Sequence, residues 1–204
     1  MPTDEAKPYH HGELRAALVA AALEMLEREG PKTLSLRALA RKVGVSSMAP
    51  YHHFADRDAM LAAVATAGFE QLQKRKLETA SHLVVGEALV QGAGDYVRFI
   101  LDHPNLYHLM KGPQFADRAR YPDLHRAAAA PAGTLLALVS ELLEQNQLLQ
   151  PTAEQGAVML WGLAHGTGML ALDGQIDPSS APEIAWQGAE AMISGWLTNT
   201  PTRR

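Results

Sequence analysis

The chain has 204 residues, of which 47% are hydrophobic and 20% charged, and its formal net charge is −4. These values exclude a disordered or collagen-like chain and leave room for one or two small globular domains. The absence of cysteine excludes disulfides, thiolate nucleophiles and thiolate zinc sites. No run approaches the roughly 18 to 20 uninterrupted apolar residues of a membrane span, and the first residues are polar, so we expect a cytoplasmic protein without membrane contact.

Charge is unevenly distributed along the chain. Residues 31–57 hold five basic residues and one acid, a net charge of +4, which leaves −8 for the remainder. A basic segment on an acidic body is compatible with nucleic-acid binding, but short basic clusters are also common on solvated surfaces. The charge pattern therefore leaves both interpretations open.

The chain is predicted to be helical nearly throughout. Apolar residues recur at three- and four-residue spacings, and the alternation typical of strands is absent. The predicted helices span residues 14–29, 35–43, 47–54, 57–78, 85–102, 104–111, 123–149, 152–172 and 182–198. We therefore expect an all-α fold, with an N-terminal three-helix domain over residues 1–58 that a long helix joins to a C-terminal helical domain over residues 59–204.

Single residues mark several helix ends. Ser35 and Asp56 are the predicted N-caps of the second and fourth helices, and Gly44 ends the second. Pro50 falls in the first turn of the third helix, where proline is tolerated. Pro131 is expected to kink or split the helix in which it lies.

The second and third helices have the features of a helix-turn-helix. Two short helices that cross steeply need a small residue where they touch, a glycine in the turn and apolar residues that fix the angle. Ala40 and Gly44 meet the first two needs, and Leu39, Val43 and Val45 meet the third. Helical hairpins without a DNA partner share this spacing, so it does not decide the function alone.

The residues around this turn carry a more specific pattern. The chain contains TLSLRALA at 33–40, VGVS at 43–46, YHHF at 51–54 and DRDAML at 56–61. Over residues 14–61 it closely resembles the DNA-binding domain of the TetR family of bacterial repressors. In that family Tyr-x-His-Phe closes the recognition helix and a lysine opens the next helix, where Arg57 stands here. Pro50 departs from the family's usual Leu or Ile, and the basic residue often found near Ser47 is absent.

The resemblance implies which residues meet DNA. Small, apolar and hydroxyl side chains of the recognition helix are expected at the floor of the major groove, namely Ser46, Ser47, Met48, Ala49 and His52. Phosphate contacts are expected from Arg41, Lys42, Tyr51, His53 and Arg57, and Arg37 is also assigned to DNA binding. A solvated surface pair is the alternative for His52 and His53. Residues 7–11 are expected to form an arm that reaches the DNA backbone or the minor groove.

The C-terminal part resembles one subgroup of the same family. HPNLY at 103–107 and WGLAHG at 161–166 match a C-terminal domain with a Trp-x-x-x-His-Gly signature. The resemblance implies a ligand-binding and dimerisation domain whose last two helices form the homodimer interface, with apolar surface from Met159, Leu163, Leu170, Ile184, Met192, Ile193, Trp196 and Leu197. The expected ligand-binding residues combine apolar bodies with polar tips and are Tyr96, Phe99, Tyr107, Met110, Trp161, His165 and Met169. Ordinary core packing is the alternative for each of them.

Enzyme and metal chemistry find little support in the sequence. There is no nucleophile elbow, phosphate-binding loop or dinucleotide fingerprint, so we expect no catalytic activity and no cofactor. A metal site built from His103, His108, His125 and His165 is an unfavoured alternative, because no His-x-x-x-His or His-Glu-x-x-His run is present. A nucleoid protein would be far more basic.

The sequence predicts a ligand-responsive transcriptional regulator, expected to be a repressor. It is expected to bind a palindromic double-stranded operator as a homodimer and to answer to an unknown small-molecule effector. The alternative is an all-α small-molecule-binding protein or enzyme whose helix-turn-helix-like segment does not bind DNA.

Overall fold

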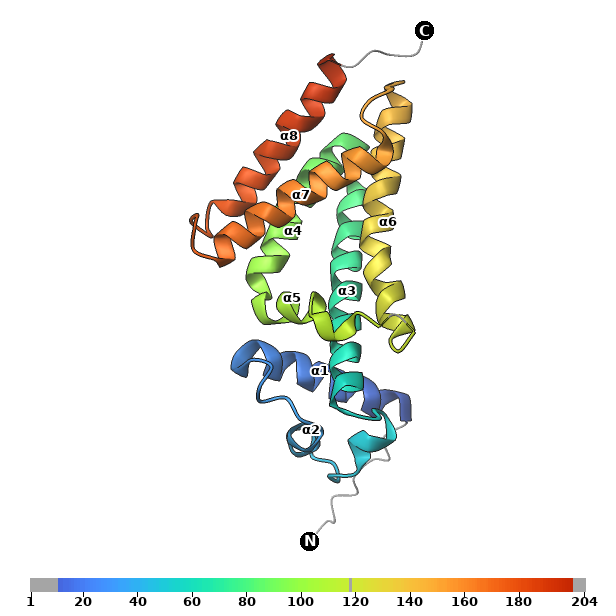
Figure 1. Cartoon of the computed structure of the whole chain (residues 1–204), viewed down its shortest axis with the longest axis vertical. Coiled ribbons are helices and arrows are strands. Elements are labelled where there is room, and N and C mark those ends of the chain that lie inside the picture. Colours follow the sequence, from blue (N-terminus) through green and yellow to red (C-terminus); the bar gives the residue numbers. More distant parts are fainter. Residues whose placement is uncertain (1–10, 118, 200–204) are drawn as a thin grey trace.

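The computed structural model describes residues 11–117 and 119–199, and within these ranges the chain forms α-helices and two short 3₁₀ turns without a strand (Figure 1). The predicted all-α fold is confirmed. The expected arm over residues 7–11 lies outside the described residues, apart from the backbone of the first helical position. One apolar core runs through the molecule from Leu18 in the first helix to Trp196 in the last.

The N-terminal helices begin and end where local signals place them. They are α1 (His11–Glu29), α2 (Leu36–Val43), the 3₁₀ turn η1 (Ala49–His52) and the start of α3 (Arg57–His82). Ser35 Oγ accepts a hydrogen bond from Ala38 N at 3.1 Å, and Asp56 Oδ1 accepts one from Ala59 N at 2.7 Å, so both predicted N-caps are confirmed. Gly44 ends α2 with a φ of 78°, a left-handed conformation that favours glycine.

The predicted α-helix over residues 47–54 is wrong. Only a 3₁₀ turn forms there, with hydrogen bonds from Tyr51 N to Met48 O at 3.1 Å and from His53 N to Pro50 O at 3.0 Å. Pro50 has no amide hydrogen, so it cannot donate the bond to Ser46 O that an α-helix requires. The Ser46 carbonyl instead accepts from Ala49 N at 3.0 Å, which is the tighter 3₁₀ pattern.

The helix α3 is longer than predicted and joins the two parts of the molecule. It ends at His82 rather than at residue 78. Figure 1 shows it rising from the N-terminal helices and running beside α6 through the C-terminal bundle. Gly68 lies where α5 crosses it, because a Cβ there would come within 2.7 Å of Met110 Sδ and 2.9 Å of Leu106 Cδ1.

The C-terminal bundle surrounds the upper part of α3. Its elements are α4 (Val85–Asp102), α5 (Pro104–Met110), the 3₁₀ turn η2 (Pro113–Phe115), α6 (Pro122–Gln145), α7 (Ala153–Leu172) and α8 (Ala181–Asn199). The expected end of α6 is wrong, because the helix ends at Gln145 rather than at residue 149, with Gln147 in a left-handed conformation (φ 56°). Of the two outcomes expected at Pro131, the split does not occur, since the helix continues through this buried residue.

The helix α6 is also long and apolar enough to cross a membrane by length and composition alone. It is the one described helix that meets this test, and a single such helix is weak evidence for a span. Its inner face packs against α3, α4 and α7. Gln73 Nε2 of α3 donates a hydrogen bond to Thr134 Oγ1 at 2.9 Å across this contact. We therefore treat α6 as a helix of the bundle.

Candidate functional sites

The turn that follows α2 presents polar and apolar side chains to solvent. Met48 is 61% exposed and Tyr51 43% exposed. Ser46, Ser47 and His52 are also exposed, whereas Ala49 and His53 are half-buried. Phe54 is buried at 3% exposure, with the Arg15 guanidinium 5.5 Å from its ring centre. The five residues expected at the groove floor thus belong to one short surface segment.

The basic residues nearby have different surroundings. Arg37 and Arg41 are exposed on α2. Lys42 Nζ forms an ion pair with Glu24 Oε1 of α1 at 2.8 Å, which lowers the pKa of that carboxyl. The side chains of Lys42 and Glu24 are 30% and 52% exposed, so the pair is reached by solvent and the lysine can exchange its partner for another anion.

Arg57 also makes two hydrogen bonds within the protein that the sequence did not predict. Its Nε donates to Leu34 O at 2.9 Å and its Nη2 donates to Pro31 O at 2.6 Å. These bonds attach the first residue of α3 to the loop between α1 and α2. A guanidinium has five N–H donors, so this attachment is compatible with the expected phosphate contact.

Polar contacts at two places, Glu27 and Asp56, connect the helix-turn-helix to the C-terminal bundle. Glu27 of α1 is partly buried against α5, where Oε1 accepts from Leu106 N at 3.2 Å, and burial raises the pKa of this carboxyl. Asp56 Oδ2 forms an ion pair with Arg120 Nη2 at 2.8 Å. The pKa of Asp56 is lowered first by its Ala59 backbone bond and then by Arg120. A shift of α5 would therefore directly displace α1, because Glu27 is bonded to Leu106.

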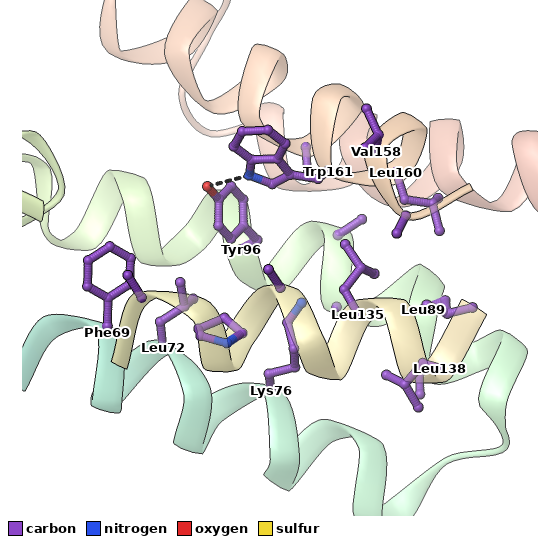
Figure 2. A pocket seen from close by; sticks show the side chains of 18 of the residues that line it. Phe69, Leu72, Lys76, Leu89, Tyr96, Leu135, Leu138, Val158, Leu160 and Trp161 are labelled. Carbon is purple, nitrogen blue, oxygen red and sulfur yellow. Dashed lines mark hydrogen bonds between the residues drawn. The ribbon is translucent and has the colours of Figure 1, made fainter. Parts of the chain in front are cut away.

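A pocket of about 340 Å³ lies in the C-terminal bundle (Figure 2). Its walls come from α3, α4, α6 and α7, together with one residue that follows α5. Most of the lining is aliphatic or aromatic. The lining residues are Phe69, Leu72, Lys76, Ala88, Leu89, Gly92, Ala93, Tyr96, Lys111, Ala128, Pro131, Ala132, Leu135, Leu138, Ala157, Val158, Leu160, Trp161 and Ala164. The volume is at the lower end of the range for small-molecule sites.

The expected ligand-binding residues divide into three groups around this pocket. Tyr96 and Trp161 line it. Tyr107 and His165 stand behind Tyr96 in one hydrogen-bonded chain. Phe99, Met110 and Met169 are absent from the described lining; Phe99 and Met110 are buried core residues and Met169 is partly buried against the core.

The hydrogen-bonded chain links three helices. Trp161 Nε1 donates to the Tyr96 hydroxyl at 3.1 Å, the Tyr96 and Tyr107 hydroxyls are 2.7 Å apart, and Tyr107 Oη is 2.7 Å from His165 Nδ1. Burial and the nearby Lys111 lower the pKa of His165, which favours a neutral ring. The Trp161 indole can only donate, and every member of the chain is satisfied when each hydroxyl donates toward the histidine and Nδ1 accepts. Burial raises the pKa of both tyrosines, so the phenols stay protonated.

Removing the middle hydroxyl is expected to destabilise the protein. Tyr107→Phe keeps the ring but leaves the Tyr96 hydroxyl and His165 Nδ1 without their partner, at a cost of about 1 to 3 kcal/mol in the free energy of unfolding. Tyr121→Phe is the matched control, since the Tyr121 hydroxyl is buried without a partner among the described residues. Urea unfolding should show loss only for Tyr107→Phe, and equal stabilities would contradict the chain.

Two lysines also line the pocket, and sequence reasoning missed both. Lys76 follows Phe69 and Leu72 along one face of α3, and burial lowers its pKa to about 8. Lys111 Nζ lies 5.6, 5.8 and 5.6 Å from the ring centres of Phe69, Tyr107 and Trp161, and burial lowers its pKa as well. For Lys76, the sequence offered one signal, namely a lysine at a position of the helix where the apolar stripe continues.

The four histidines weighed for a metal site have separate surroundings. His103 lies 3.8 Å from Glu27, His125 Nε2 is 2.8 Å from Phe115 O, and His165 joins the tyrosine chain. Within residues 11–117 and 119–199, no three His, Asp or Glu side chains gather as metal ligands would. The structure thus assigns His103, His125 and His165 to other contacts, and His108 is exposed on α5.

The outer faces of α7 and α8 carry part of the apolar surface expected for a dimer. The exposed members are Met159, Leu170, Ile184 and Leu197, whereas Leu163 and Met192 are half-buried and Ile193 and Trp196 belong to the protomer core. The glycines of α7 also divide into closely packed and open positions. A Cβ at Gly156 or Gly168 would collide with Val139 or Ile100, while Gly162 and Gly166 have no described atom within 4 Å of that position.

Comparison with known proteins places both parts of the chain. Residues 18–64 match the family described as bacterial regulatory proteins of the tetR family, and residues 89–194 match the tetracyclin repressor-like C-terminal domain. The chain is 27% identical over 164 residues to an uncharacterised HTH-type transcriptional regulator of Mycobacterium tuberculosis, which covers 80% of this chain and 72% of that protein.

Solved structures show the same architecture. A protein of unknown function from Rhodococcus sp. RHA1 is 32% identical, with a TM-score of 0.83 over 95% of this chain and 100% of that one. A regulator of the TetR/AcrR family from Thermobifida fusca shares the fold at 20% identity, with a TM-score of 0.68 over 94% and 99% of the two chains. Since the family models match both the DNA-binding segment and most of the helical body, the chain belongs to the TetR family of bacterial transcriptional regulators.

Proposed function

We propose that this ligand-responsive DNA-binding regulator is a homodimeric repressor of a palindromic operator, and that it has no catalytic activity. The observation that carries the proposal is the segment from Ser46 to His52, which packs against α2 beside the exposed Arg37 and Arg41. Around the buried Pro50 it exposes Ser46, Ser47, Met48, Tyr51 and His52. Apolar, hydroxyl and imidazole side chains suit contact with base edges, and the arginines suit phosphates.

The same assignment applies to the residues that have partners within the protein. Lys42 is expected to exchange Glu24 for a phosphate, and Arg57 is expected to contact the DNA backbone while it holds the loop before α2. Tyr51 and His53 complete the proposed phosphate contacts. Division of the chain at residues 58 and 59 into DNA-binding and ligand-binding domains belongs to this proposal, with α3 continuous across the boundary.

Dimerisation is proposed through α7 and α8. The exposed Met159, Leu170, Ile184 and Leu197 provide apolar surface, and the open Gly162 and Gly166 allow a second helix to approach closely. Two antiparallel pairs of helices would form a four-helix bundle about a two-fold axis. A two-fold protein requires an inverted repeat in its operator, with half-site centres about 34 to 36 Å apart.

The effector is proposed to act through α3. Phe69, Leu72 and Lys76 of this helix line the pocket, and the same helix begins at Arg57 in the DNA-binding part. A ligand that separates α3 from α6 and α7 would change the spacing of the two recognition segments and release DNA. By linkage, operator DNA must weaken ligand binding by the same factor.

The proposal is tested by selecting bound duplexes from a random DNA library with the full-length protein. We expect enrichment of an inverted repeat whose affinity falls steeply with salt, because lysines and arginines release counterions from phosphates. Absence of enrichment at low salt would favour the alternative of an all-α small-molecule-binding protein or enzyme. Equal operator affinity with and without a verified effector would refute the proposed release mechanism.

Replacing one surface tyrosine is expected to weaken binding to every duplex. Tyr51→Ala removes a proposed phosphate contact, so operators that differ by one base pair should lose affinity by a similar factor, about 5- to 30-fold. Met48→Ala is the comparison, because loss of a thymine-methyl contact should lower affinity mainly for one base pair. A loss for Tyr51→Ala that is confined to one base pair would contradict the phosphate role.

A further inference from the structure

We propose that the effector is a carboxylate carried on an apolar body, and that its carboxylate binds the ammonium group of Lys76. This inference rests on the proposed function of the pocket and names the class of molecule that the pocket takes.

The pocket lining contains cations and lacks a balancing anion. Lys76 and Lys111 are its charged members, and every other described lining residue is uncharged. Two acids of α4 directly precede lining residues, namely Glu87, which is exposed and outside the lining, and Asp95, which precedes Tyr96. The Asp95 carboxylate accepts hydrogen bonds from Thr79, Gln91 and Arg98 at 2.8 to 3.0 Å and does not belong to the lining. The site therefore carries an uncompensated positive charge.

The two lysines are not equivalent. Burial lowers the pKa of both ammonium groups, but Lys111 as a whole residue is exposed, and three aromatic rings within 6 Å attract its ammonium and offset part of the cost of burial. Lys76 is half-buried, and no described side chain forms an ion pair or hydrogen bond with it. Figure 2 shows its side chain rising from α3 toward the space bordered by Tyr96, Leu135 and Trp161. A buried ammonium without a counter-charge is costly, and a bound anion removes that cost.

The remaining wall defines the body of the ligand. Leu72, Leu89, Leu135, Leu138 and Leu160 surround the space with aliphatic carbon, and Tyr96 and Trp161 add ring faces. Polyhydroxylated or strongly charged molecules would leave polar groups unpaired against this wall. A carboxylate fits a single ammonium, whereas a dianionic phosphate would call for further donors. A medium-chain fatty acid or an aromatic carboxylate meets both demands.

The test measures direct binding to the full-length protein without DNA. The probes are octanoate, decanoate, dodecanoate and naphthoate, each paired with the alcohol of the same carbon skeleton, and binding is followed by calorimetry. We expect at least one carboxylate to bind about 10- to 100-fold more tightly than its alcohol, because a charge-assisted hydrogen bond is gained. If no carboxylate exceeds its alcohol, including the case in which none binds, the proposal is overturned.

Variants identify the anchor. Lys76→Met should bind each carboxylate and its alcohol about equally, since methionine keeps the apolar stem and removes the charge. Lys74→Met is the matched control, because Lys74 lies on the same helix with 79% of its side chain exposed, and it should keep the carboxylate preference. A preference that survives in Lys76→Met would overturn the assignment. Operator binding by the ligand-free protein is measured separately, so failure of the ligand class and failure of the regulatory function are distinguishable.

Discussion

Replacing Lys76 by methionine is expected to stabilise the ligand-free protein at pH 7 by about 2 to 3 kcal/mol. Burial lowers the pKa of Lys76 from its ordinary value of 10.5 to about 8, and each pKa unit corresponds to about 1.4 kcal/mol between charged and neutral forms. The full conversion gives about 3 to 4 kcal/mol, and the expected stabilisation is smaller because the Lys76 side chain keeps some exposure to the pocket. Methionine fills the same volume without a charge, so the cost of burying the ammonium disappears.

The effect of Lys76 has a defined pH window. Below pH 8 the ammonium is charged in both the folded and the unfolded chain, so the destabilisation is fully present. Between pH 8 and 10.5 the unfolded chain still binds the proton that the folded protein has lost, so stability rises with pH. The difference between Lys76→Met and the parent protein should therefore be largest below pH 8 and shrink toward zero near pH 10.5.

Urea unfolding from pH 6 to 10 measures this difference at one protein concentration, since the stability of a dimer depends on its concentration. Lys111 and the tyrosines titrate in both Lys76→Met and the parent protein, so their effects on stability cancel in the difference between the two. Lys74→Met removes a solvated lysine and should change stability by less than about 0.5 kcal/mol at every pH. A Lys76→Met protein that is less stable than the parent at pH 7 would show that the ammonium has a favourable partner.

Helix boundaries were predictable wherever a local signal fixes them. Ser35 and Asp56 are N-caps whose side chains bond as expected, and Gly44 ends α2 in the left-handed conformation. The end of α3 was not predictable from the sequence, because its last turn depends on contacts with a distant helix. Thr79 Oγ1 donates to Asp95 Oδ2 of α4 at 2.9 Å, and this bond joins residues 16 positions apart. The periodicity of a single helix contains no information about such a contact.

The pocket was predictable in part. Tyr96 and Trp161 were identified from their mixed chemistry, and they meet in one hydrogen bond. Tyr107 and His165 are 58 positions apart, so their contact depends on how α5 packs against α7. Lys76 was missed because a lysine beside apolar residues is ordinarily a solvated side chain that covers a helix with its stem. The placement of α4, α6 and α7 around this part of α3 encloses it, and that placement is not visible in the sequence of one helix.

A charged side chain at Gly162 is expected to convert the proposed dimer into a monomer. In the protomer Gly162 is exposed on α7, and no described atom lies within 4 Å of the position of an added Cβ. Gly162→Arg therefore has room within its own chain, and arginine favours a helix over glycine by up to about 1 kcal/mol. In the proposed interface the same side chain would separate the two copies of α7 and bury an unpaired charge.

Loss of the dimer should also lower the affinity of the protein for its operator. Two linked recognition segments bind an inverted repeat with an affinity about 10²- to 10⁴-fold above that of one segment, so the variant should lose operator affinity by a factor in this range. Light scattering gives the mass and a titration with the selected operator gives the affinity. Gly133→Arg is the matched control, because Gly133 is equally open but lies on α6. A Gly162→Arg dimer with the parent affinity would place the interface on another face, whereas a monomer that keeps its helicity and unfolds cooperatively would assign both dimerisation and half-site spacing to the outer face of α7.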